Sequence, residues 1–170
     1  MIIGNRVQII PLTDECFDLT LKWVNNPELR RYIGSRFPVS KYEHEVWFKA
    51  HAVDKYNKTY AIQLKDSKDI IGLIGNTEYD SINRSTYPFI YVGETGDRGH
   101  GIGQEALTLF VDFCFNELNI HKVYGYMYAY NTASIHLHEK CGYLCEGVLK
   151  KHWFKDGEYH DVLIMGRINE

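Results

Sequence analysis

Apolar residues recur along the chain with two periods, one typical of strands and one of helices. Alternation of apolar and polar positions predicts β-strands over residues 6–11, 60–64, 70–75, 86–92 and 121–130. Steps of three and four residues predict helices over residues 17–23, 46–51 and 107–118. Asn131 is placed to cap a further helix that Gly142 ends. Asp156-Gly157 predicts a tight turn between two last strands, over residues 147–154 and 159–168.

The order of these elements is strand, helices, three strands, helix, strand, helix and hairpin. This order predicts an α/β (α+β) fold, in which helices flank a mixed and largely antiparallel sheet. The 170 residues suit a single domain, 1–170, that buries about two-thirds of its unfolded surface.

Composition narrows the classes of partner. There are 19 basic and 22 acidic residues and no long run of Lys or Arg, so direct binding to nucleic acid is not expected. The four cysteines include no Cys-x-x-Cys pair, which favours a reduced, cytoplasmic setting. No window of the chain is apolar enough to suggest a leader or a membrane span.

A glycine-rich stretch precedes the helix predicted over 107–118. Gly99, Gly101 and Gly103 alternate with other residues, so the backbone can take positive φ and turn its amides toward a ligand. The N-terminus of the following helix would add a positive dipole at the same place. A plain tight turn is the alternative. The stretch lacks the Lys-Ser or Lys-Thr of a Walker loop and the spacing of the dinucleotide fingerprint, which argues against nucleotide hydrolysis and hydride transfer.

Two motifs together resemble the GNAT superfamily of N-acetyltransferases. Arg98-x-x-Gly101-x-Gly103 is similar to the acyl-CoA pyrophosphate loop of that family. The stretch Asn131-Thr-Ala-Ser-Ile-His-Leu-His-Glu-Lys-Cys-Gly-Tyr143 resembles the family's later Asn-x-x-Ala-Ile-x-Leu-Tyr-Glu-Lys motif. The resemblance extends over nearly the whole chain. It is nearest to the ribosomal-protein alanine, spermidine and nucleotide-sugar amine acetyltransferases, and it implies a sheet with splayed central strands.

The resemblance also implies where acetyl-CoA binds. Pantetheine would lie between the splayed strands and the pyrophosphate would lie on the glycine loop. The residues that this implies for cofactor binding are Ile90, Tyr91, Val92, Arg98, Gly99, His100, Gly101, Ile102, Gly103, Asn131, Ser134 and His138.

His138 departs from the family pattern, which has a tyrosine there as the expected general acid for the CoA thiolate. An imidazolium with an ordinary pKa of about 6.5 is a stronger acid than a phenol but is only partly populated at pH 7. His138 either takes over the role of the tyrosine or only fills its space. In the second case, water or a side chain such as Tyr130 or Tyr143 protonates the thiolate.

The attacking amine must be neutral, so a general base is expected. Glu78, Asp80 and Glu94 are candidates through a bound water, with a solvated carboxylate as the alternative for each. A backbone N–H near Tyr91 or Val92 would stabilise the oxyanion. No grouping of ligands has zinc spacing, so no metal is expected.

The predicted activity is transfer of an acetyl group from acetyl-CoA to a primary amine by direct attack in a ternary complex. A non-catalytic acyl-CoA-binding regulatory module is the alternative. The amine belongs to a small molecule or to a protein N-terminus, and the sequence leaves this open. A polyamine enzyme should show an acidic acceptor cleft. A homodimer is expected through exposed edge strands.

Overall fold

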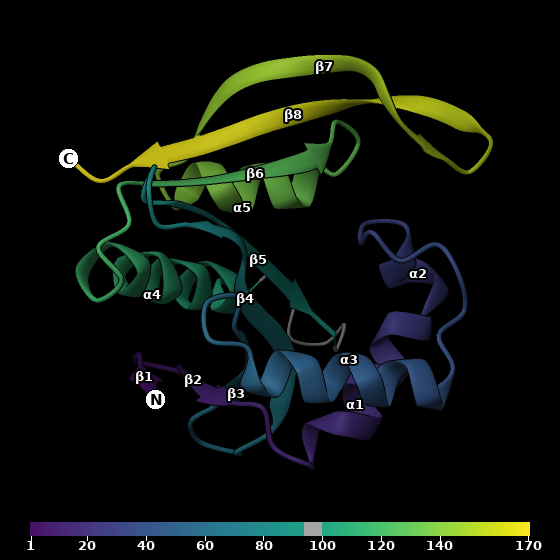
Figure 1. Ribbon diagram of the computed structural model, residues 1–170, viewed down its shortest axis with the longest axis vertical. Coiled ribbons are helices and arrows are strands. Elements are labelled where there is room, and N and C mark those ends of the chain that lie inside the picture. Colours follow the sequence, from purple (N-terminus) through teal and green to yellow (C-terminus); the bar gives the residue numbers. More distant parts are fainter. Residues whose placement is uncertain (94–99) are drawn as a thin grey trace.

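The protein is described by a computed structural model that covers residues 1–93 and 100–170 (Figure 1). The strands are β1 (Ile2–Ile3), β2 (Val7–Pro11), β3 (Thr59–Leu64), β4 (Ile70–Asp80), β5 (Ser85–Val92), β6 (Lys122–Tyr128), β7 (Leu144–Lys155) and β8 (Glu158–Ile168). The helices are α1 (Cys16–Asn25), α2 (Pro27–Arg30), α3 (Lys41–Val53), α4 (Ile102–Asn116) and α5 (Thr132–Lys140). The predicted fold class is confirmed.

The strands of the described residues form one sheet in the order β1-β2-β3-β4-β5-β6-β8-β7. Neighbouring strands are antiparallel except β5 and β6, which pair in parallel. That parallel ladder joins only Ser85 to Lys122 and Thr86 to Val123, and beyond it the two strands diverge. Pro88, which has no N–H to donate, lies in the part of β5 that has left β6. The splayed centre that the resemblance implies is therefore present.

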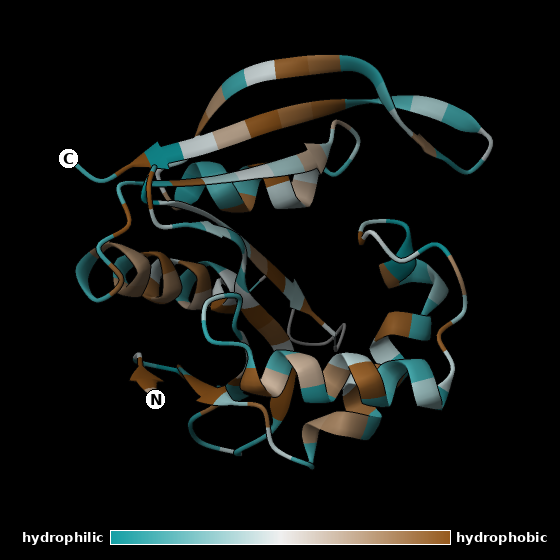
Figure 2. Ribbon diagram, in the orientation of Figure 1, coloured by the Kyte–Doolittle hydropathy of each residue, from teal (hydrophilic) through white to brown (hydrophobic). Residues whose placement is uncertain are grey.

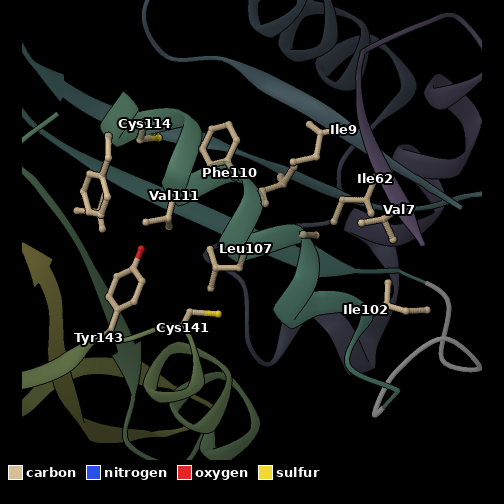
Figure 3. Packing of buried hydrophobic residues seen from close by; sticks show 14 of the residues in the cluster. Val7, Ile9, Ile62, Ile102, Leu107, Phe110, Val111, Cys114, Cys141 and Tyr143 are labelled. Atoms are coloured by element: carbon tan, nitrogen blue, oxygen red, sulfur yellow. The ribbon is translucent and has the colours of Figure 1, made fainter. Parts of the chain in front are cut away.

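The sheet separates two apolar clusters because neighbouring residues of a strand face opposite sides. Ile62 and Ile74 pack with Phe110 and other residues of α4, whereas Ala61 and Leu73 belong to the cluster that holds Trp23 of α1. Figure 2 shows the apolar stripe of α4, and Figure 3 shows its side chains in the larger cluster. Complete burial of each large side chain contributes about 2–3 kcal/mol to folding.

Local signals in the sequence account for several element ends. Ser40 and Glu43 form a capping box at α3, in which the Glu43 N–H donates to Ser40 Oγ over 3.2 Å. Asn131 caps α5 by accepting from the Ser134 N–H at 3.2 Å. Asp156 and Gly157 both have positive φ, at 50° and 87°, as a two-residue hairpin turn requires.

Several boundaries differ from the expectation. The strand expected over 70–75 runs to Asp80, because its polar last residues still pair with β5. The last hairpin begins at Leu144 instead of residue 147. β1 is only two residues long and was not predicted. The central helix begins at Ile102, so Gly103 lies in its first turn and not in the preceding loop.

Candidate active site

A cleft of about 920 Å³ opens where β5 and β6 separate. Residues 87–92 of β5 form one wall, and residues 126–128 of β6 with the first turns of α5 form the other. Gly101 and Gly103 border the cleft at the start of α4, and Tyr32 and Arg36 border it after α2. Strands, a helix N-terminus and a loop therefore meet around one concave surface, as in a ligand site.

The start of α4 lies beside this cleft with its first backbone amides free of intrahelical partners. Gly101 is the N-cap in the left-handed conformation, with φ of +77°, where a side chain would be strained. A Cβ on Gly103 would meet only Leu137, at 3.8 Å. His100, Gly101, Ile102 and Gly103 are therefore together at the helix terminus, whereas Arg98, Gly99 and Glu94 lie outside the described residues.

An ion pair joins the N-terminal segment to the first turn of α4. The Arg6 Nε lies 3.0 Å from Glu105 Oε2, and Arg6 Nη1 donates to the His100 carbonyl oxygen over 2.8 Å. The Arg6 backbone N–H also donates to Glu105 Oε1, at 2.8 Å. Burial alone would raise the pKa of Glu105, but the hydrogen bonds from Arg6, Val7 and Asn5 together outweigh it and lower the pKa. Sequence reasoning missed this pair, since its partners are 99 residues apart.

The β5 residues expected at the pantetheine differ in the direction of their backbone N–H and C=O groups. The Gly93 N–H donates to the Ile71 carbonyl oxygen over 2.8 Å, toward β4. Backbone groups alternate along a strand, so those of Tyr91 also face β4 and those of Ile90 and Val92 face the cleft.

His138 lines the cleft but is only 5% exposed. Its Nδ1 lies 2.8 Å from the Ser134 carbonyl oxygen, one turn earlier in α5. A carbonyl only accepts, so Nδ1 carries the hydrogen and the neutral ring keeps its lone pair on Nε2. Burial lowers the pKa of His138, and the hydrogen bond to Ser134 opposes this shift only in part. The neutral form is thus favoured.

Neither of the two tyrosines considered as alternative acids is available, because Tyr143 is buried and the Tyr130 hydroxyl is hydrogen-bonded to Arg31. Tyr143 is 2% exposed in the large cluster, and Figure 3 shows its hydroxyl directed toward Val111. That hydroxyl has no hydrogen-bond partner among the described residues, and burial raises its pKa. The Tyr130 hydroxyl donates to the Arg31 carbonyl oxygen over 2.7 Å, and burial raises its pKa to about 12.

Glu78 and Asp80 lie at the hairpin end of β4 and are absent from the described residues that line the cleft. Glu78 accepts a hydrogen bond from the Tyr124 hydroxyl at 2.7 Å. Asp80 accepts from the backbone N–H groups of Asn83 and Ile82, both at 2.8 Å, and these bonds lower its pKa. Both carboxylates hold local structure in this geometry.

The loop after α2 is fastened to the tip of the last hairpin. Lys155 Nζ donates to the Arg30 carbonyl oxygen over 2.8 Å and to the Ser35 carbonyl oxygen over 3.4 Å. Arg31 and Asp156 form an exposed ion pair at 3.8 Å. The sequence signals the hairpin turn at Asp156, but it gives no sign of what the turn touches.

The described residues contain no group of three or more His, Cys, Asp or Glu side chains that could hold a metal ion. No helix among them is long and apolar enough to cross a membrane.

A splayed sheet whose cleft meets a glycine-capped helix N-terminus is the arrangement that the family resemblance predicts for an acyl-CoA-binding protein. Residues 6–144 match the family model described as Acetyltransferase (GNAT) domain. The chain therefore belongs to the GNAT acetyltransferases.

Known proteins agree with this assignment. The chain is similar to the spermidine N(1)-acetyltransferase of Vibrio cholerae, with 29% identity over 146 residues, 84% of this chain and 83% of the relative. It is 34% identical to a prophage-derived N-acetyltransferase of Bacillus subtilis over 64% of this chain and 61% of that protein. A crystal structure of the Vibrio cholerae spermidine enzyme with CoA and spermine superposes with a TM-score of 0.89 and 26% identity, covering 97% of this chain and 96% of that one.

Membership fixes the reaction class. The protein is an acyltransferase that moves an acetyl group from acetyl-CoA to an amine.

Proposed function

We propose that acetyl-CoA binds along the cleft between β5 and β6 and that the amine attacks its thioester directly, in a ternary complex. The observation that carries this proposal is the divergence of β5 from β6 beside the Gly101-capped start of α4. The cleft-facing backbone of Ile90 and Val92 suits the pantetheine amides. Amides from His100 to Gly103 suit the pyrophosphate, to which Arg98 and Gly99 are predicted to add contacts.

Two groups must be stabilised during the transfer, the oxyanion and the departing thiolate. A β5 backbone N–H serves the oxyanion, and Val92 suits this role better than Tyr91 because of its direction. Ser134 and Asn131 position the start of α5 beside the cleft. His138 is proposed to pack against the cofactor as a neutral ring, so that the thiolate takes its proton from solvent.

We propose Glu94 as the general base, acting through a water. In the sequence it lies two residues beyond the end of β5. Glu78 and Asp80 have weaker support because neither lines the described cleft. A Glu94→Gln variant that kept full activity on an amine of high pKa would remove the residue from this role.

Initial-rate kinetics with release of CoA thiol test the mechanism. Intersecting double-reciprocal lines are expected, and parallel lines would indicate an acetyl-enzyme intermediate instead. Gly103→Val should abolish acetyl-CoA binding by placing a side chain where the pyrophosphate lies. Gly147→Val is the matched control, because its Cβ has the same 3.8 Å clearance from its nearest neighbour but lies in β7, outside the cleft.

We further propose a single catalytic domain in a reduced, cytoplasmic setting, consistent with four free cysteines. A homodimer or a larger assembly is expected, and a dodecamer is described for the Vibrio cholerae relative. Size-exclusion chromatography with light scattering tests the assembly state.

A further inference from the structure

Among the described residues, those that line the cleft carry positive charge and no negative charge. None of the described residues that line it is Asp or Glu, whereas Arg36 borders it after α2. Figure 1 shows α2 and the following loop across β4 and β5 from α4, and we expect the acceptor to enter on the α2 side. We propose that the acceptor is a small anionic molecule, in which a ring carries both the reactive primary amine and a phosphate or carboxylate group. This inference rests on the proposed function.

Arg36 occupies a built position. The Arg30 guanidinium donates through Nη2 to the carbonyl oxygen of Arg36. The preceding Ser35 is held by Lys155, and the Tyr130 hydroxyl holds the carbonyl of Arg31. The backbone that carries the Arg36 guanidinium is therefore fastened at several points, which reduces the conformational entropy lost when an anion binds there.

The positive charge of Arg36 lies close enough to Tyr128, which lines the cleft, to affect the pKa of its hydroxyl. Burial raises the pKa of Tyr128, and the nearby positive charge of Arg36 acts in the opposite direction. Tyr128 stacks on Tyr130 with ring centroids 4.8 Å apart, and Trp153 meets Tyr128 edge-on at 4.9 Å. Tyr128 is only 5% exposed, so the cleft-lining rings that suit the face of a sugar or another ring beside the guanidinium are those of Tyr32, Tyr126 and Trp153.

A polycation needs negative charge beside it, whereas Arg36 supplies positive charge. Tyrosine and tryptophan rings attract an ammonium group, but each further ammonium needs a carboxylate to offset its lost hydration. Asp156 is the carboxylate whose charge reaches Tyr128, and it is paired with Arg31 outside the cleft lining. Lys140 of α5 also lines the cleft, and its positive charge suits the cofactor phosphates.

The experiment compares four amines with acetyl-CoA: glucosamine 6-phosphate, UDP-glucosamine, glucosamine and spermidine. Thiol release gives kcat/KM for each, and calorimetry in the presence of CoA gives binding without turnover. The two anionic amines should exceed glucosamine and spermidine by at least about tenfold, the factor of one charge-assisted contact. The comparison of glucosamine 6-phosphate with UDP-glucosamine distinguishes a simple phosphate from a nucleotide-linked phosphate.

Arg36→Gln should remove this preference, lowering kcat/KM for the anionic amines about tenfold and changing that for glucosamine less than twofold. Arg36→Glu should reverse it toward spermidine. Lys49→Gln is the control, because it removes one positive charge from an exposed site on α3. Equal or better use of spermidine by the wild type, or a preference that survives Arg36→Gln, would overturn the inference alone. CoA binding with no turnover and no amine binding would overturn the proposed function as well.

Discussion

Titration of His138 distinguishes the two roles that the sequence left open. The ring is 5% exposed and gives its Nδ1 hydrogen to the Ser134 carbonyl. An ordinary imidazole with a pKa of 6.5 is only about one-tenth protonated at pH 7.5. Burial lowers the pKa of His138 further, so its imidazolium should be scarcer still in the free enzyme. We expect an NMR titration to give a midpoint below 6.5, with the hydrogen of the neutral ring on Nδ1.

Two substitutions separate the ring's acid chemistry from its structural contribution. His138→Asn keeps a nitrogen donor for the Ser134 carbonyl but cannot titrate. His138→Ala loses that hydrogen bond, worth about 1 kcal/mol, and leaves a cavity beside Tyr143, whose ring centroid is 4.9 Å away. Together these losses should reduce the free energy of unfolding by about 2–4 kcal/mol. His138→Asn should cost less, and thermal unfolding gives both values.

The kinetic expectation is that His138→Asn lowers kcat less than tenfold and leaves the alkaline limb of the pH profile in place. A general acid contributes about 10²–10⁴-fold. A loss of that size in a folded His138→Asn enzyme, rescued by His138→Tyr, would refute the neutral-ring interpretation. A titration midpoint above 6.5 would do the same.

Three further outcomes are expected. Arg6→Ala should raise the KM for acetyl-CoA about tenfold, because Arg6 binds Glu105 and the His100 carbonyl at the end of the glycine loop. The KM for acetyl-pantetheine should stay unchanged, because this donor has no pyrophosphate. Equal effects on both donors would contradict a role of Arg6 in positioning the loop. Tyr130→Phe should raise the acceptor KM severalfold and cost about 1 kcal/mol of stability, with no change in the acetyl-CoA KM. Burial lowers the pKa of His44, so the unfolded state binds more protons, and stability should fall as the pH drops below about 6.5. His44→Gln should flatten this dependence in thermal melts, and an unchanged slope would exclude His44 as its source.

Local patterns predicted most of the fold because each strand, cap and turn is specified by nearby residues. Asn131 and Asp156-Gly157 are examples, since their side-chain or backbone preferences act within three residues. The departure of β5 from β6 has no such signal. It depends on pairing between Thr86 and Val123, and only the family resemblance predicted it.

Sequence patterns likewise predicted only part of the candidate site. The family resemblance predicted that His138 and the start of α4 would lie beside the cofactor, and in the structure both line the same cleft. The sequence could not show which nitrogen of His138 carries hydrogen, because that depends on the hydrogen bond to the Ser134 carbonyl oxygen. It also could not join Lys155 to Arg30, which are 125 residues apart. Such contacts form only when the whole sheet is assembled.

The short parallel ladder between β5 and β6 has a consequence for cooperativity. Strand pairing links β1–β5 to the β6–β8–β7 part of the sheet at two residue pairs only. The larger apolar cluster and side-chain hydrogen bonds such as that of Tyr130 to Arg31 supply further connections. A cofactor lying between β5 and β6 would bond to both parts at once and take the place of missing strand pairs. Amides of β6 and β8 should then exchange hydrogen more slowly in the presence of CoA, by up to the factor 1 + [CoA]/Kd. The acyl donor would thus complete the sheet as well as the reaction.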